Sequence, residues 1–305
     1  MNTPARLAVF GGALVLLAAG GFAVGNAAGP VSAATSETAD HGEGHDTAMP
    51  DHAGTAAADA LPGGLASSKD GYTFTVADPT PEPGRFSFTI TGPDGKPVTA
   101  FDVEHEKRLH LIVVRRDTAG FQHVHPDLAP DGTWSVPLTL PAAGSYRAFA
   151  DFAPTGGKPM TLGADLSVAG DYQPAAYAPS RTARVDGYTV ELAGDLTAGK
   201  TSPLTLTVSR DGVPVTDLQP YLGAYGHLVA LREGDLAYLH VHPDGEPGDG
   251  KTAAGPQVRF AAEVPSAGTY RLFLDFRHGD VVRTAEFTLT TAGTPSPEPT
   301  HGHGH

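Results

Sequence analysis

Short stretches in which apolar and polar residues alternate, or in which apolar residues run together, recur along the chain between turns rich in Pro and Gly. None of them has a convincing helical period, whereas a period of two residues is typical of half-buried strands. In the first copy of a repeated unit, the pattern predicts strands over residues 72–76, 85–90, 109–115, 121–125, 133–140, 145–152 and 162–168. About seven short strands in roughly a hundred residues favour an all-β fold with two tandem immunoglobulin-like or cupredoxin-like β-sandwich domains.

The same motifs occur twice in the same order. Residues 70–73, 123–127 and 144–152 return as residues 186–189, 240–244 and 268–276. Since the order is kept, we interpret the chain as a duplicated domain. The sequence predicts a first repeat over residues 69–170, a linker over residues 171–185 and a second repeat over residues 186–293.

An uncharged run rich in Leu, Val, Ala and Gly occupies residues 7–24, directly after Arg6. This layout is typical of a secretory signal, and the small residues around Ala33 offer a cleavage site after it. The run is also close to the length of a short membrane-spanning helix. Residues 1–33 are therefore predicted to be either a signal peptide or an uncleaved hydrophobic helix that anchors the protein in the membrane, and both interpretations predict an exported, extracytoplasmic protein that is membrane-anchored or secreted.

The amino-acid composition excludes several kinds of partner and of metal site. The chain has 20 Lys and Arg against 34 Asp and Glu, a formal net charge of −14, so it lacks the clustered cations that nucleic-acid binding requires, and nucleic acid is excluded as a partner. The sequence points to no particular protein partner. Because there is no Cys, disulfide scaffolds, thiolate zinc sites, iron–sulfur clusters and blue-copper sites are excluded as well. The 14 His remain, and they fall into small groups.

Each repeat carries one His thirteen residues before a His-x-His-Pro motif. The two sets of three, called triads below, are His110, His123 and His125 in the first repeat and His227, His240 and His242 in the second. Two histidines at positions i and i+2 of a strand share a face. The third joins them if the hairpin has the right parity: a two-residue loop at Glu233-Gly234 would put His227 opposite His240, whereas a three-residue loop would send it to the other face.

Three neutral imidazoles on one sheet face are suited to a divalent metal ion. Without thiolate ligands the plausible ions are Cu(II), Zn(II) or Ni(II), with Cu(II) favoured by its affinity for nitrogen ligands. The sequence therefore predicts one three-His site per repeat for Cu(II) or Zn(II). Possible supplementary ligands are His105, with Glu104 and Glu106 beside it, in the first repeat, and His278 and Asp275 in the second.

Further histidines lie in the two segments that flank the repeats. Residues 34–68 and 294–305 contain almost no large apolar residues, so they are predicted to be a disordered spacer and a disordered His-rich tail. Histidine-rich tracts of this kind scavenge metal ions. The candidate metal-binding residues of these flexible arms are His41, His45, His52, His301, His303 and His305.

Other functions compete with metal binding. The triads would serve only to stabilise a hairpin if the protein were a structural or interaction module of the cell envelope. A three-His metalloenzyme would need a general base beside an open coordination position, and no Ser/His/Asp order or phosphate-binding loop is present, so the chain is predicted not to be an enzyme. The repeated Tyr-Arg-x-Phe-x-Asp-Phe motif predicts that Arg147 pairs with Asp151, and Arg271 with Asp275, along one strand face.

One resemblance rests on these same motifs. Residues 105–114 with 121–126, and residues 221–228 with 239–243, resemble segments of exported actinobacterial tandem-repeat proteins with His-x-His-Pro modules. The resemblance covers most of residues 70–292. It implies an association with the handling of copper or other heavy metals.

Overall fold

The computed structural model of the protein describes residues 61–81 and 83–292, with the backbone alone described at His240 and His242. The predicted N-terminal hydrophobic segment, most of the spacer and the tail lie outside these residues, and so do all six histidines of the flexible arms. Within the described part of the chain, no helix is long and apolar enough to span a membrane. Both repeats belong to one compact unit.

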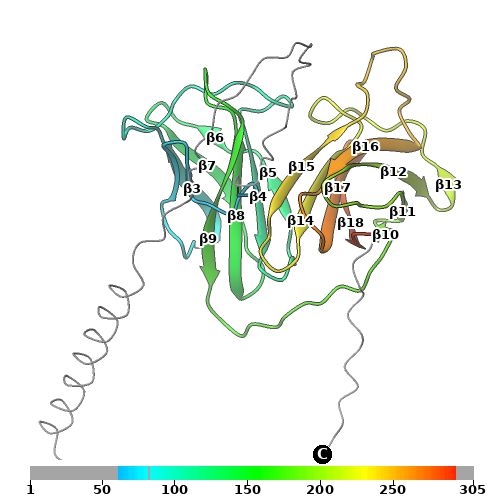
Figure 1. Cartoon of the computed structure of the whole chain (residues 1–305), viewed down its shortest axis with the longest axis horizontal. Coiled ribbons are helices and arrows are strands. Elements are labelled where there is room, and N and C mark those ends of the chain that lie inside the picture. The colour runs from blue at the N-terminus through cyan, green and yellow to red at the C-terminus, as the bar shows by residue number, and fades with distance from the viewer. Residues whose placement is uncertain (1–60, 82, 293–305) are drawn as a thin grey trace, which may run out of the picture. The chain divides into compact units, whose positions relative to one another are not determined.

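The first repeat is a sandwich of two antiparallel sheets (Figure 1). Its seven predicted strands are confirmed, and it has two further strands of two residues each, one before the first predicted strand and one between the fourth and the fifth. One sheet has the order β1 (Ser68–Lys69), β2 (Tyr72–Val76), β3 (Gly84–Thr91), β7 (Thr133–Leu138) and β6 (Asp127–Leu128). The other has the order β5 (Gln122–Val124), β4 (Leu109–Arg115), β8 (Gly144–Phe152) and β9 (Met160–Val168).

The second repeat has the same strand arrangement, but its two layers are joined into one sheet because β15 pairs with both β14 and β16. The order along this sheet is β10 (Thr182–Val185), β11 (Tyr188–Ala193), β12 (Thr201–Arg210), β16 (Gln257–Glu263), β15 (Tyr238–Pro243), β14 (His227–Arg232), β17 (Thr269–His278) and β18 (Val281–Thr290), with β13 (Val213–Pro214) beside β12. The described chain is therefore all-β, as the sequence predicts.

Each repeat has its own hydrophobic core between its layers. In the first, Phe88 and Trp134 from one sheet pack with Leu111 and Leu162 from the other. In the second, residues of β11, β12 and β16 pack against residues of β14, β17 and β18. Burial on one face of each strand produces the alternation seen in the sequence; in β3, for example, Phe86, Phe88 and Ile90 are buried and the residues between them are less so.

Strand β4 differs because all of its residues are buried. Its Leu109, Leu111 and Val113 face the core of the first repeat, while Ile112 and Val114 face outward from that sandwich. The outward residues pack into a third cluster, which contains Val229, Leu231, Leu236, Tyr238 and Phe273 of the second repeat. The two repeats are therefore docked through the outer faces of their β4 and β14 sheets, and we call this cluster the inter-repeat core.

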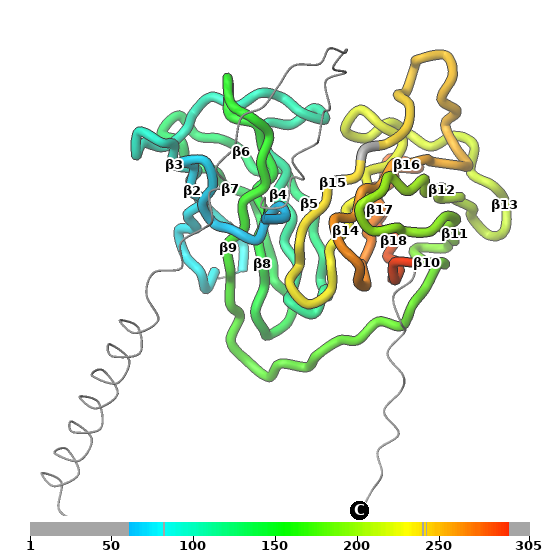
Figure 2. The backbone as a smooth tube through the Cα atoms, viewed as in Figure 1, coloured from blue at the N-terminus to red at the C-terminus, as the bar shows by residue number. Residues whose placement is uncertain are grey.

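The connection between β9 and β10 follows an extended path without strands of its own (Figure 2). It is fixed to the first repeat by Arg115, which donates a hydrogen bond to the carbonyl oxygen of Gln173 (3.0 Å), and by Asp117, which accepts one from the backbone N–H of Ala175 (2.7 Å). On the second repeat, the guanidinium of Arg271 lies 3.7 Å from the centre of the Tyr177 ring. Both ends of the linker are thus held against folded structure.

The contribution of the Asp117 carboxylate to the stability of the fold depends on pH. Burial alone would raise the pKa of Asp117, but hydrogen bonds from Arg115 and from the Ala175 and Ala119 amides outweigh burial and lower the pKa to about 2. An acid whose pKa is lower in the folded state stabilises the fold above its unfolded pKa, and this contribution is lost as the pH falls through the folded value. Asp117 should therefore stabilise the fold fully above about pH 4 and lose this effect towards pH 2.

We expect the free energy of unfolding to differ between the wild type and the Asp117→Asn variant by an amount that shrinks as the pH falls from about 5 to about 2. Denaturant unfolding over a pH series measures this difference, and comparing the two proteins cancels the titration of the other carboxylates. A difference that stayed constant over the whole series would contradict this role of the Asp117 charge.

Candidate metal centre

The β4–β5 hairpin brings the first triad onto one face. Ile112 pairs with His123 and Leu111 pairs with Val124, so residue 110 lies across from residue 125. Directly opposed residues share a face of an antiparallel pair, and residues two apart on a strand share one too. His110, His123 and His125 therefore share the face of Ile112, which is the face that docks against the second repeat.

The second hairpin has the same register. Leu228 pairs with Val241 and Val229 pairs with His240, so residue 227 lies across from residue 242. The predicted two-residue loop at Glu233-Gly234 is wrong, because the last cross-strand pair is Leu231 with Tyr238 and the connection is longer. Its parity is nevertheless even, so His227 stays on the same face as positions 240 and 242, with His242 and not His240 as its direct opposite.

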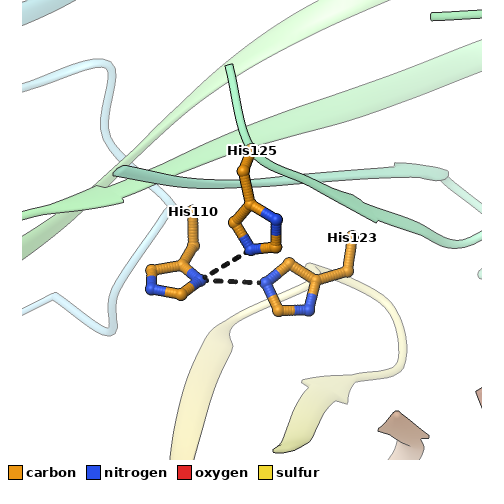
Figure 3. Close-up of side chains that lie close together, drawn as sticks. All are labelled: His110, His123 and His125. Atoms are coloured by element: carbon orange, nitrogen blue, oxygen red, sulfur yellow. Dashed lines mark hydrogen bonds between the residues drawn. The ribbon is translucent and has the colours of Figure 1, made fainter. Parts of the chain in front are cut away.

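In the first triad, three ring nitrogens converge (Figure 3). The Nδ1 atom of His110 lies 3.0 Å from Nε2 of His123 and 3.2 Å from Nε2 of His125. Among the described residues, these three are the set of potential metal ligands whose ligand atoms all lie within 4.8 Å of one another. His110 is only 3% exposed, so this group is largely shielded from solvent.

Hydrogen bonds on the far sides of two rings determine which nitrogens carry lone pairs. His110 Nε2 lies 3.1 Å from the carbonyl oxygen of Glu104, and His123 Nδ1 lies 2.8 Å from Oδ2 of Asp275. Both partners are acceptors, so His110 Nε2 and His123 Nδ1 must be the protonated, donating nitrogens. In the neutral rings, His110 Nδ1 and His123 Nε2 then carry lone pairs that face each other across 3.0 Å.

The third ring is held neutral by its surroundings. Burial, together with the neighbouring rings of His123 and His110, lowers the pKa of His125 to about 2. Protonation of His125 is therefore disfavoured at neutral pH, and the neutral imidazole is the form that can bind a metal ion.

Asp275 comes from the second repeat, although the ring that it orients belongs to the first. It lies on β17 opposite His227 and also accepts a hydrogen bond from the hydroxyl of Thr284 (2.6 Å). The Asp275 side chain is 5% exposed, and that of His123 is 4% exposed. A buried carboxylate behind a histidine is typical of metal sites, because it fixes the ring and raises the basicity of the ligating nitrogen.

Further aromatic rings from both repeats surround the first triad. The His227 ring centre lies 6.5 Å from that of His110 and 6.4 Å from that of His123, and the His105 ring centre lies 5.3 Å from His227. His227 donates from Nε2 towards the carbonyl oxygens of Tyr221 (3.1 Å) and Leu222 (3.0 Å). Burial and the charge of Asp275 raise the pKa of Tyr221 to about 12, so its hydroxyl stays protonated at neutral pH.

The predicted supplementary ligands lie at different distances from the first triad. His105 lies near the triad, with its ring centre 6.0 Å from that of His110. Asp275 reaches the site through His123. His278 lies outside the converging group: its Nδ1 is 2.6 Å from the Tyr188 hydroxyl and its Nε2 is 3.1 Å from Oδ1 of Asp217.

The predicted pairing of Arg147 with Asp151, and of Arg271 with Asp275, is wrong. Arg147 pairs with Asp165 (2.7 Å), and Arg271 pairs with Glu286, because both carboxylates lie on the neighbouring strand within reach of the guanidinium. Asp151 instead accepts hydrogen bonds from the hydroxyls of Thr161 (2.8 Å) and of Tyr238 (3.1 Å), which belongs to the second repeat.

Two features of the site differ from the interpretation of the sequence. Glu104 orients His110 through its backbone carbonyl and not through its side chain. Asp151, which could ligate but is expected to pair with Arg147, accepts hydrogen bonds from Thr161 and Tyr238. The Arg-x-Phe-x-Asp motif in the sequence could have indicated the position of both aspartates. Residues two apart on a strand share a face, so Asp151 lies on the face of Phe149 and Asp275 on the face of Phe273.

The chain is similar to several solved structures, at low sequence identity and low TM-score. A two fibronectin type-III domain segment from chicken tenascin is 14% identical, covering 72% of this chain and 97% of that chain, with a TM-score of 0.21. A putative membrane anchored protein from Corynebacterium diphtheriae is 12% identical, covering 75% of this chain and 60% of that chain, with a TM-score of 0.23.

No curated protein sequence matches the chain. A family model does match, over residues 67–170 and 183–293, which include the whole of both predicted repeats. The chain therefore belongs to the family described as Domain of unknown function (DUF8832).

Proposed function

We propose that the protein is an extracytoplasmic binder of a divalent metal ion, Cu(II) or Zn(II), that serves in metal sequestration, delivery or sensing, with one three-His site per repeat. Its scaffold is the tandem immunoglobulin-like or cupredoxin-like sandwich. The observation that carries the proposal is the convergence of His110 Nδ1, His123 Nε2 and His125 Nε2, with two of these rings oriented by acceptors behind them.

The spacing of these nitrogens fits an ion. Two nitrogens bound to one metal at 2.0–2.1 Å in tetrahedral geometry lie about 3.3 Å apart. The separations of 3.0 and 3.2 Å in the triad are within a few tenths of an ångström of that spacing. His110, His123 and His125 would hold the ion, Asp275 would hold the His123 ring in place, and the charge of Asp275 would offset part of the charge of the ion.

The ligand chemistry limits the choice of ion. Imidazole suits both copper and zinc, and the affinity order for nitrogen ligands favours Cu(II). The chain offers no thiolate. Export is supported by the uncharged residues 7–24, which would deliver the repeats outside the cytoplasm, and the His-rich arms would collect ions for the sites in the repeats.

Calorimetric titration with Cu(II) and Zn(II) tests the proposal on the full chain with the six arm histidines (His41, His45, His52, His301, His303 and His305) replaced by alanine. We expect saturable binding that survives loss of the arms, because the described ligands lie in the repeats. His278→Ala is the matched control, since it removes a histidine outside the triad and should leave binding unchanged. If the arm-substituted chain shows no saturable binding of either ion, the proposed function fails.

A further inference from the structure

The docked repeats contact each other through equivalent residues. Phe121 of the first repeat stacks on Phe273 of the second, with ring centres 4.0 Å apart. The counterparts of these residues are Tyr238 and Phe149, and they also stack, with ring centres 5.4 Å apart. A contact that occurs twice with exchanged partners is the mark of an isologous interface, so the two repeats are related by an approximate two-fold axis.

The groups around the triad repeat in the same manner. His110 and His227 occupy equivalent positions, and each donates from Nε2 to a backbone carbonyl six residues earlier, at Glu104 and Tyr221, both at 3.1 Å. When each ring is neutral, this equivalent hydrogen bond at Nε2 leaves the lone pair on Nδ1. The second repeat thus keeps the feature that prepares His110 as a ligand.

The carboxylates are equivalent as well. Asp275 lies opposite His227 and accepts from Thr284, while Asp151 lies opposite His110 and accepts from Thr161. Asp275 reaches across the interface to His123, and Asp151 reaches across it in the opposite direction, to Tyr238 on β15. Strand β15 also carries His240, the counterpart of His123.

We propose that the two triads form a single two-ion centre across the repeat interface, in which each repeat's ligands are oriented by the carboxylate of the other repeat. Asp275 positions His123, and Asp151 takes the corresponding role for His240. The inference rests on the proposed metal binding but goes beyond it, because two independent sites would need neither docking nor exchanged carboxylates. The separation of 6.5 Å between the His110 and His227 ring centres puts the two ligand sets side by side.

The two ion positions are not identical. His105 and Leu222 are equivalent residues, and both adopt a left-handed backbone, with φ of 48° and 54°. Only the first repeat therefore has a histidine at this place, with its ring centre 6.0 Å from His110 and 5.3 Å from His227. The two ions should consequently bind with unequal affinity.

Stoichiometry and spin coupling test the proposal directly. The arm-substituted full chain is loaded with one and then two equivalents of Cu(II), bound copper is measured after dialysis, and electron paramagnetic resonance spectra are recorded. We expect two Cu(II) per chain and, at the second equivalent, a signal altered by interaction between the two spins. One Cu(II) per chain, or two with independent spectra, would overturn the two-ion centre while leaving metal binding intact. An absence of binding would refute the proposed function itself.

The carboxylates are tested by Asp275→Asn and Asp151→Asn, which keep the side-chain size. Each variant should weaken one of the two ions by about 10- to 100-fold, the usual effect of removing a partner that orients a ligand. The matched control is Asp217→Asn, because Asp217 also pairs with a histidine, His278, outside the centre. Equal affinities in the Asp275→Asn, Asp217→Asn and wild-type proteins would contradict the cross-repeat role of Asp275.

Discussion

Replacing His125 with alanine should lower the affinity of the first-repeat site for Cu(II) by about 100-fold or more. An orienting residue behind a ligand is worth 10- to 100-fold, and a direct ligand should be worth at least the upper end of that range. His125 is the suitable position because it is less buried than His110 and, unlike His123, has no hydrogen bond to Asp275, so its removal keeps the His123–Asp275 contact in place.

The measurement is competition for Cu(II) against a chelator of known affinity, in the arm-substituted chain. His278→Ala is the matched control, because His278 contacts Tyr188 and Asp217 and does not belong to the converging triad. We expect His278→Ala to bind Cu(II) as tightly as the unsubstituted chain. If His125→Ala bound Cu(II) as tightly as the unsubstituted chain, the triad would not be the site.

The Phe273→Ala substitution should give the largest loss of stability, about 3–5 kcal/mol. Phe273 is fully buried in the inter-repeat core and stacks on Phe121. Its removal loses apolar burial and leaves a cavity between two rigid sheets that cannot readily close around it. Because the cluster joins the repeats, the substitution should weaken their docking as well as the second repeat itself.

Denaturant unfolding followed by fluorescence of Trp134 in the first repeat and by far-UV circular dichroism measures this effect. In the wild type we expect coincident transitions, whereas in Phe273→Ala the second repeat should unfold before the first. Val281→Ala is the control, because Val281 lies on the neighbouring strand and is 47% exposed. A loss below about 1 kcal/mol for Phe273→Ala would show that the outer faces of the sheets contribute little to the fold.

The strands could be predicted because alternating apolar and polar residues indicate a strand that is buried on one of its two faces. Strand β4 was predicted with its observed bounds, and the shared face of the triad followed from the i, i+2 spacing and the parity of the hairpin. The loop length was not predictable from Glu233-Gly234 alone, since Gly234 has a positive φ of 97° within a longer connection as readily as in a two-residue turn.

The sequence does not show which element covers the second face of β4. The run from Leu109 to Arg115 shows that both faces are buried, but burial does not specify the covering element. That element is the second repeat, more than a hundred residues away. The role of Asp275 as the partner of His123 depends on this docking, and short-range rules favoured its pairing with Arg271 instead.

The linker, which is held by Asp117 at one end and by Arg271 at the other, makes association of the two repeats a unimolecular event. The local concentration of one repeat near the other is set by this tether and not by the amount of protein, so docking is insensitive to dilution. Cutting the chain between Val168 and Thr182 would convert the interface into an ordinary bimolecular complex that dissociates when diluted. Duplication within one chain thus supplies what a homodimer obtains only at sufficient concentration.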